Sequence, residues 1–370
     1  MKQQIHSMLP RETHDERSRL AFISALREFS MAGLYPQLRP YYERALVPAF
    51  VARHREPPRT SDQVRALMEA SPFYQGFSLI ARATQELLWD SVGGVVERQL
   101  PDLIERARSL GRSGVRPQLD PELPLPDYTA AVDIHVMPGG YHTDLTEDDV
   151  FAGAVYDRGV YVFAFGGLGA LNDELGVATA KAVRRQFPEF RPGKILELGC
   201  GAGLSTLPLA DVFPEAEVHA IDLGAPMVRY ASARARALGY QIGFSQRDAT
   251  HTDLPDASFD LIVSSLLLHE LPRAAILEVL RECHRLLRPG GVMAHHDLLR
   301  WPDDPFDSFM MAWTTRHNNE PFERASGTLN FAKECEAVGF APQDVFVISE
   351  PGVYLEEVYQ VSGIRGARKA

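Results

Sequence analysis

Three glycines stand at alternate positions in a short run that follows an apolar stretch. The run Leu198–Leu204 reads Leu-Gly-Cys-Gly-Ala-Gly-Leu, so Gly199, Gly201 and Gly203 carry no side chain. Alternate glycines let the backbone approach a ligand where a Cβ would clash, and the amides of a following helix would face that ligand. The spacing predicts a ligand-binding loop between a strand and a helix. Taken by itself, such a loop has an alternative interpretation as a tight turn without a ligand.

Two common nucleotide-binding loops differ from this loop in their spacing. A dinucleotide fingerprint requires GxGxxG or GxGxxA, and the sixth position here is Leu204. A phosphate-binding loop requires GxxxxGK followed by Ser or Thr, and no lysine follows Gly203. A nicotinamide-dependent oxidoreductase is therefore disfavoured and is kept only as an alternative from another class of enzyme.

Polar residues end the expected strands that follow the glycine loop. Asp222 ends the second strand about 20 residues after the loop, where a carboxylate can bind ribose hydroxyls. Asp248 and Ala249 follow the third strand, where a side chain and an amide can bind an adenine edge, and Ser264 ends the fourth. One such acid could cap a helix. A series at successive strand ends instead predicts one ligand site, because ligands bind outside the carboxyl ends of the strands in open α/β sheets.

His269 lies just past the fourth expected strand and is followed by Glu270. Histidine has a pKa near neutrality and is suited to removing a proton from a hydroxyl group. His269 therefore has two interpretations. It is either a general base beside Glu270, or a residue that packs against or caps the next helix.

A second pair of histidines, His295 and His296, ends the fifth expected strand before Asp297. Neighbours on a strand point to opposite faces, so at most one of the two should enter the cleft. We include His296 among the candidate catalytic residues. Paired histidines could bind a metal ion, but we predict no metal site.

The elements that must position these residues follow from hydrophobic periodicity. From Lys194 onward, short apolar runs alternate with helical patterns, which predicts a mostly parallel sheet covered by helices on both faces. Two later apolar runs could add an edge hairpin. The expected strands are Lys194–Leu198, Glu217–Asp222, Gly243–Arg247, Asp260–Ser264 and Val292–Asp297, and the later runs are Val345–Ile348 and Val358–Val361.

The chain before the glycine loop has a different pattern. It is helical from Ser18 to about Leu110, with an apolar stripe over Ala83 to Ala107, and prolines between positions 117 and 138 then break any helix. We expect a helical domain with a proline-rich linker over residues 1–138, a lid segment over 139–192 and an α/β domain over 193–370. The stripe consists of Leu87, Leu88, Val92, Val95, Val96, Leu100 and Ile104.

Composition limits the class of protein. The 370 residues are 45% hydrophobic, which is enough for two domains with a buried core. A net charge of −11 argues against a sequence-independent nucleic-acid or anionic-membrane binder. The polar start, the lack of a run of about 18 apolar residues and three well-separated cysteines predict a cytoplasmic protein. We therefore expect neither nucleic acid nor membrane as a partner.

The order of these motifs resembles the class I S-adenosylmethionine-dependent methyltransferases over residues 194 to 299. This resemblance implies a Rossmann-like sheet of seven strands and S-adenosylmethionine as cofactor. It implies that Glu197 and the three glycines surround the methionine part, that Asp222 binds the ribose, and that the adenine contacts Leu223, Met227 and Asp248. It rests on Glu-Leu-Gly-Cys-Gly-Ala-Gly (197–203), Ile221-Asp222-Leu223, Arg247-Asp248-Ala249, Phe259-Asp260-Leu261-Ile262-Val263 and Leu287-Arg288-Pro289-Gly290-Gly291.

The segment around His269 resembles the O-methyltransferases that act on small molecules, in which this histidine is the base. Glu270 stands where those enzymes carry an aspartate. The resemblance implies methyl transfer to oxygen of a small-molecule acceptor, and the N-terminal helices match the dimerisation domains of these enzymes in position and size. We expect a homodimer, and we expect Tyr156 or Arg158 in the lid to contact cofactor or acceptor. Transfer to nitrogen, carbon or sulfur, and a cofactor-binding partner protein without transferase activity, are the alternatives.

Overall fold

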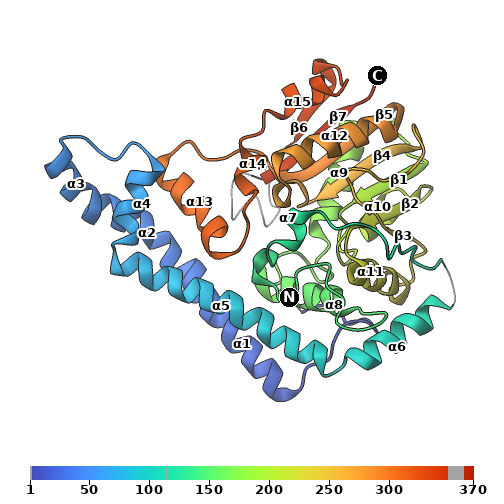
Figure 1. The fold of residues 1–370 in the computed structure, drawn as a ribbon, viewed down its shortest axis with the longest axis horizontal. Coiled ribbons are helices and arrows are strands. Elements are labelled where there is room, and N and C mark those ends of the chain that lie inside the picture. The colour runs from blue at the N-terminus through green and yellow to red at the C-terminus, as the bar shows by residue number, and fades with distance from the viewer. Residues whose placement is uncertain (1, 113–114, 349–361) are drawn as a thin grey trace.

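The computed structural model describes residues 2–112, 115–348 and 362–370, and Figure 1 shows how its elements are arranged. Seven strands form one sheet in the order β3-β2-β1-β4-β5-β7-β6. Strand β7 runs antiparallel to both β5 and β6, and the other neighbours are parallel. The strands are β1 (Lys194–Leu198), β2 (Glu217–Asp222), β3 (Gly243–Gln246), β4 (Phe259–Ser265), β5 (Leu287–Leu298), β6 (Val345–Ile348) and β7 (Ser362–Arg368).

The predicted fold class, a seven-stranded α/β sheet with an N-terminal helical part, is confirmed. Strands β1, β2 and β6 have the predicted bounds, while β4 and β5 extend beyond them. The expected strand Val358–Val361 lies outside the described residues, and β7 begins at Ser362. The apolar runs located the strands well because these strands are buried on both faces of the sheet.

Helices cover both faces of the sheet and divide its core into two clusters. Ile195 of β1 packs in the cluster on one face, together with residues of α9, α10 and α11. Its neighbour Leu196 points to the other face, where α12 and α15 lie. These helices are α9 (Glu174–Gln186), α10 (Leu207–Val212), α11 (Ala225–Ala237), α12 (Arg273–Leu286) and α15 (Phe331–Ala337).

The N-terminal region is helical as predicted, and the apolar stripe expected over residues 83–107 spans two helices. The first ends at Glu97 and the second begins at Leu100, because Gln99 leaves the helical conformation (φ −117°, ψ 2°) and Pro101 favours a helix start. The helices of this region are α1 (His14–Glu28), α2 (Tyr35–Tyr41), α3 (Val47–His54), α4 (Ser61–Glu69), α5 (Pro72–Glu97) and α6 (Leu100–Gly111), with π-helical segments η1 (Phe29–Leu34) and η2 (Tyr42–Leu46).

Helix α13 (Pro305–His317) comes from the chain after β5 but packs into the N-terminal helical core. Its Phe309 is buried in the same cluster as Leu38 and Phe77, and the Trp313 indole donates to Ser78 Oγ at 2.8 Å. Figure 1 shows α13 between the long α5 and the sheet. No sequence pattern indicated this packing. The domain boundary at residue 193 stays a prediction, and α13 packs on the other side of it.

Helix α8 (Phe151–Phe163) joins the N-terminal helices to the sheet domain by close packing. A Cβ on Gly153 would collide with Tyr230 of α11, and a Cβ on Gly159 would collide with Trp89 of α5. Only glycine permits these approaches. Helix α8 lies in the segment expected as a lid, and its position between α5 and α11 is fixed by these two contacts.

A buried carboxylate completes the attachment of α8. Asp157 accepts hydrogen bonds from the Tyr230 hydroxyl at 2.9 Å and from Arg234 Nε at 3.0 Å, and His6 Nε2 lies 3.2 Å away. Burial raises the pKa of Asp157, but Arg234 and His6 outweigh it and lower the pKa to about 2. Gln4 N also donates to Ala170 O at 2.8 Å, so the N-terminal segment is bound beside α8.

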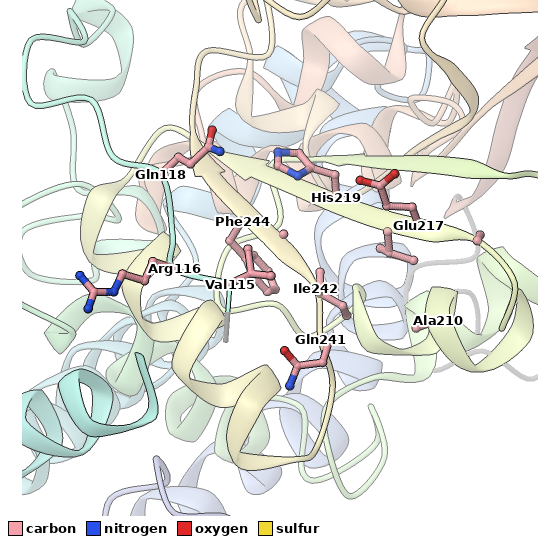
Figure 2. A pocket seen from close by; sticks show the side chains of 12 residues that line it. Val115, Arg116, Gln118, Ala210, Glu217, His219, Gln241, Ile242 and Phe244 are labelled. Atoms are coloured by element: carbon pink, nitrogen blue, oxygen red, sulfur yellow. The ribbon is translucent and has the colours of Figure 1, made fainter. Parts of the chain in front are cut away.

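The proline-rich linker runs along the edge strand β3. Gln118 N donates to Phe244 O at 2.9 Å, and Gln246 N donates to Gln118 O at 2.8 Å, so the linker covers an otherwise open sheet edge. A cavity of about 290 Å³ lies beneath it, where Figure 2 shows Val115 beside Phe244. The amino ends of β2 and β3 contribute Glu217 and residue 243 to its lining, so this cavity lies away from the glycine loop.

The remaining described features are short elements and the cysteines. None of the described helices is long and apolar enough to span a membrane. Cys200, Cys283 and Cys335 are all buried and free. The short helical elements are α7 (Asp127–Ala130), η3 (Ile134–Val136), η4 (Leu268–Glu270), α14 (Glu323–Gly327) and η5 (Pro342–Asp344).

The packing of α8 predicts opposite effects for two glycine-to-alanine changes. Gly159→Ala should destabilise the protein by about 1–3 kcal/mol, because the added methyl overpacks the Trp89 contact. Gly94→Ala is the control: Gly94 is exposed on α5, no atom lies near its Cβ position, and the change should stabilise by about 0.5–1 kcal/mol. Urea denaturation measures both. Equal stability of the two variants would contradict the packing described here.

Candidate active site

The glycine loop lies at the carboxyl end of β1, where the backbone takes conformations that favour glycine. Gly199, Gly201 and Gly203 have φ values of 63°, 52° and 73°. Asp222, at the end of β2, accepts hydrogen bonds from Gly201 N and Gly224 N, both at 2.8 Å. One carboxylate therefore holds both the loop after β1 and the turn after β2.

Two carboxylates at this loop lack a cationic partner. Burial raises the pKa of Glu197 to about 8 and the pKa of Asp222 to about 6. Glu197 accepts a hydrogen bond from the Thr206 hydroxyl, and neither acid forms an ion pair with a described residue. A cationic ligand bound here would favour the ionised form of both carboxylates.

Side chains from two directions cover the glycine loop. A Cβ on Gly201 would lie 3.9 Å from the Tyr156 ring of α8, and a Cβ on Gly199 would lie 2.8 Å from Leu267. The Tyr156 ring meets Tyr141 edge to face, with ring centroids 5.6 Å apart. Leu267 and Tyr156 therefore pack against the loop from two sides.

The two lid residues expected to contact cofactor or acceptor, Tyr156 and Arg158, lie in different places. Tyr156 lies against the loop, whereas Arg158 Nε donates to Glu12 Oε1 at 2.5 Å and Arg158 NH1 donates to Gln3 at 3.1 Å. Arg158 therefore faces the N-terminal segment and is not brought to the loop. Neighbouring residues on a helix point in different directions, so they do not share one ligand site.

The residues expected at the adenine lie where the strand order predicts, but some of their side chains are engaged. Asp248 accepts from Thr250 N and Thr250 Oγ1, both at 2.7 Å. Met227 is fully buried in the core cluster beneath α8. Leu223 and Ala249 are half-buried. Their contacts with adenine stay predictions.

Ser264 is fully buried, and its hydroxyl pairs with His295 Nδ1 at 2.8 Å. The two strand-end histidines point to opposite faces, as expected: the His295 ring lies near Phe331, and His296 Nδ1 is 3.2 Å from Thr179 Oγ1 on α9. Both histidines are buried. Within the described ranges, no group of three or more His, Cys, Asp or Glu side chains could hold a metal ion.

His269 forms a buried pair with Asp297. The two side chains meet at 3.0 Å through His269 Nδ1 and Asp297 Oδ1, and Asp297 Oδ2 accepts from Leu268 N at 2.7 Å. Burial would lower the pKa of His269, but Asp297 raises it to about 9. Burial would raise the pKa of Asp297, but His269 and then Arg365 lower it to about 2. The pair is therefore an ion pair at neutral pH.

The sequence contained a signal for this partner that our prediction did not use. Strands β4 and β5 are parallel neighbours, with Ser265 opposite His296. Residues just after β4 therefore lie beside Asp297, the residue after His296. Asp297 was part of the predicted strand, but its contact with His269 was missed.

A second cluster was missed almost entirely. His135 Nδ1 lies 2.8 Å from Glu320 Oε1, His135 Nε2 lies 3.7 Å from Glu270 Oε1, and Tyr141 OH donates to Glu270 Oε1 at 3.1 Å. Glu270 was predicted from its place beside His269. Glu320 lies in a polar loop after β5, and His135 lies in the proline-rich stretch, where no local pattern indicates a site.

Comparison with known proteins agrees with this arrangement. Residues 195–291 match the family profile described as a methyltransferase domain. This segment contains β1, the glycine loop, Asp222 and His269. Together with the strand order, it identifies the α/β part of the chain as a class I S-adenosylmethionine-dependent methyltransferase domain.

The chain matches only part of the length of its curated relatives. A malonyl-[acyl-carrier protein] O-methyltransferase of Dechloromonas aromatica is 39% identical over 109 residues, which are 29% of this chain and 37% of the relative. Phosphoethanolamine N-methyltransferase 3 of Arabidopsis thaliana is 32% identical over 123 residues, which are 33% of this chain and 24% of the relative. The chain thus spans well under two thirds of these proteins, and they differ in acceptor atom.

One solved structure also matches part of the chain. Phosphoethanolamine N-methyltransferase 2 of Haemonchus contortus, in complex with phosphomonomethylethanolamine and S-adenosylhomocysteine, is 15% identical with a TM-score of 0.43. The match covers 58% of each chain.

Proposed function

We propose that this protein transfers the methyl group of S-adenosylmethionine to an oxygen atom of a small molecule, as expected for an enzyme of small-molecule biosynthesis. The observation that carries the proposal is the buried His269–Asp297 pair, which follows β4 beside the glycine loop. A histidine held in this way can accept a proton from a hydroxyl group. Methyl transfer to nitrogen, carbon or sulfur, the alternatives, depends less on a base of this kind.

The cofactor would occupy the loop through charge and shape. Glu197 and the three glycines would surround its methionine part, and Asp222 would bind the ribose with the carboxylate lone pairs that Gly201 N and Gly224 N leave free. The uncompensated carboxylates suit a ligand with a sulfonium and an ammonium group. Tyr156 would place an aromatic ring near the cationic sulfur, which is favourable.

The adenine would lie between the turns after β2 and β3, against Leu223 and Met227. Asp248 and Ala249 N would bind its edge. These contacts require the Asp248 carboxylate to keep one oxygen available, and the described hydrogen bonds use only Oδ1.

The bound cofactor supplies an electrophilic methyl group, and the chain must orient the acceptor and remove its proton. Orientation supplies much of the acceleration in such reactions. Asp297 holds His269 through Nδ1, which leaves Nε2 to accept the acceptor's proton, and its negative charge stabilises the imidazolium that forms. Glu270 is partly exposed beside His269 and is the second residue available to contact the acceptor.

A role of His269 as base has a defined pH dependence. Because the pKa of His269 is raised to about 9, the imidazolium dominates at neutral pH and the neutral base becomes more abundant as the pH rises towards 9. Methyl transfer to a hydroxyl should rise with pH and level off near that value.

His269→Ala should lower turnover about 10²-fold or more and abolish the rise of the rate between pH 7 and 9. Turnover can be followed as transfer of labelled methyl to a panel of small phenols and alcohols. The matched control is His251→Ala, an exposed histidine after β3. Unchanged turnover in His269→Ala would reassign His269 to a structural role.

Asp222→Ala should weaken binding of S-adenosylhomocysteine about 10-fold or more, because a charged hydrogen-bond acceptor at the ribose and the loop is lost. Calorimetry measures the affinity. Asp211→Ala, which removes an exposed carboxylate on α10, should leave it unchanged. Heat with NAD(P) but none with S-adenosylhomocysteine would refute the proposed cofactor.

We also propose that the protein forms a homodimer through its N-terminal helices, because large apolar side chains are exposed there on adjacent elements. Helices α1 and α5 pack side by side. The exposed side chains are Phe22, Phe29, Leu79 and Leu87.

A double change to Phe22→Glu and Leu79→Glu should convert the dimer to a monomer, because it buries charge at the interface. Light scattering after size-exclusion chromatography measures the mass. Leu145→Glu, which alters an exposed leucine in the lid, is the control and should stay dimeric. A monomeric wild-type protein at micromolar concentration would rule the proposal out.

A further inference from the structure

His135 has a strained backbone that buried side chains hold in place. His135 and Val136 have φ values of 56° and 62°, a region that residues with side chains rarely adopt. The His135 carbonyl accepts hydrogen bonds from Trp89 Nε1 at 2.8 Å and Gln85 Nε2 at 3.1 Å, both on α5. Gln85 is fixed in turn by Arg27 NH1 at 2.9 Å. Strain held by a buried network is a reason to look for function.

The imidazole of His135 lies between two glutamates from separate parts of the chain. Glu320 follows α13 and lies 2.8 Å from Nδ1, while Glu270 follows β4 and lies 3.7 Å from Nε2. Only the doubly protonated ring can present a proton to both carboxylates. Burial would lower the pKa of His135, but Glu320 and Glu270 raise it to about 10.

This ring is connected to the glycine loop by a short series of contacts. Glu270 accepts from the Tyr141 hydroxyl, the Tyr141 ring packs edge to face on Tyr156, and Tyr156 lies over Gly201. Residues 134–163, from η3 to the end of α8, are therefore attached to the sheet domain at Glu270. Without a cation between them, Glu270 and Glu320 would repel each other at this point.

We infer that His135 is a positioning residue: by binding Glu270 and Glu320 together, it holds residues 134–150, which carry Tyr141, closed against α8 beside the glycine loop. The inference rests on the proposed function only in taking the cofactor as the ligand beneath Tyr156. The hydrogen bonds and ion pairs described for His135 do not reach the glycine loop, and it acts through Glu270 and Tyr141.

The charged groups around His135 fix the expected pH dependence. Glu320 also packs on Glu323 of α14, and burial together with the charge of Glu320 raises the pKa of Glu323 well above its usual value. Burial raises the pKa of Tyr141 well above its ordinary value. Because the pKa of His135 is raised from 6.5 to about 10, the stabilisation from these ion pairs is complete below pH 6.5. It is lost as the pH rises through about 10.

The test uses S-adenosylhomocysteine as probe and measures its association and dissociation rate constants by stopped-flow. His135→Ala should increase both constants about tenfold, because a lid that opens more often speeds entry and exit alike. Glu320→Gln, which keeps the shape of the side chain, should act in the same direction. His142→Ala is the matched control, because His142 lies in the same segment and has no described ion pair.

The pH profile separates positioning from a general structural role. In the wild-type protein both rate constants should rise above pH 9, whereas in His135→Gln they should be high and independent of pH. The pKa of His269 is raised to about 9, so the profile is measured in a His269→Gln background as well. A variant that is merely damaged would lose binding amplitude and melting temperature without faster association.

Hydrogen exchange of the free protein makes the result independent of the cofactor. Residues 134–150 should exchange faster in His135→Ala than in His142→Ala. If the wild-type protein does not bind S-adenosylhomocysteine, the proposed function fails, and the exchange rates still decide the role of His135. Equal exchange and equal rate constants in both variants would overturn the inference. If His135→Ala does not fold, His135→Gln and Glu320→Gln give the same comparison.

Discussion

The buried carboxylate of Asp297 is the interaction on which the site depends. Asp297 is at the end of β5 with no exposed surface, and it accepts hydrogen bonds from Leu268 N and from its own neighbour Leu298 N as well as meeting His269 Nδ1. A buried charge is tolerated only when it is paired and hydrogen-bonded. The turn after β4 must therefore keep this shape, and that shape holds His269 against Asp297 and places Glu270 beside Tyr141.

The rest of the site is brought to this turn by packing between distant segments. Helix α13 carries the chain from β5 into the N-terminal helical core and returns it as the loop that holds Glu320. Asp157 binds Tyr230 and Arg234 of α11, which fixes α8 and with it Tyr156. The N-terminal helices thus help to position two parts of the candidate site, the loop that holds Glu320 and helix α8 with Tyr156.

The sequence was sufficient for features that depend on local pattern or on strand order. The strands β1 and β2 were predicted with their bounds, so Glu197 lies within β1, Asp222 ends β2 and Glu270 follows β4, as expected. The contact of His269 with Asp297 follows from the β4–β5 neighbour relation and could have been predicted. His135 could not, because its strained turn depends on Trp89 and Gln85, and its partner Glu320 depends on the path of α13. Long-range packing of this kind leaves no periodicity in the sequence.

The distribution of charge explains why the two halves of the site differ. In the half near His269, two cations, His135 and His269, face three carboxylates, and Arg365 also lowers the pKa of one of them, Asp297. In the half at the glycine loop, no cation among the described residues pairs with Glu197 or Asp222, and burial raises their pKa values to about 8 and about 6. A ligand that excludes water from this half would strengthen the electrostatic interactions there. A cationic ligand would therefore favour the ionised form of both carboxylates, and this loop is the place that the proposed function gives to the sulfonium.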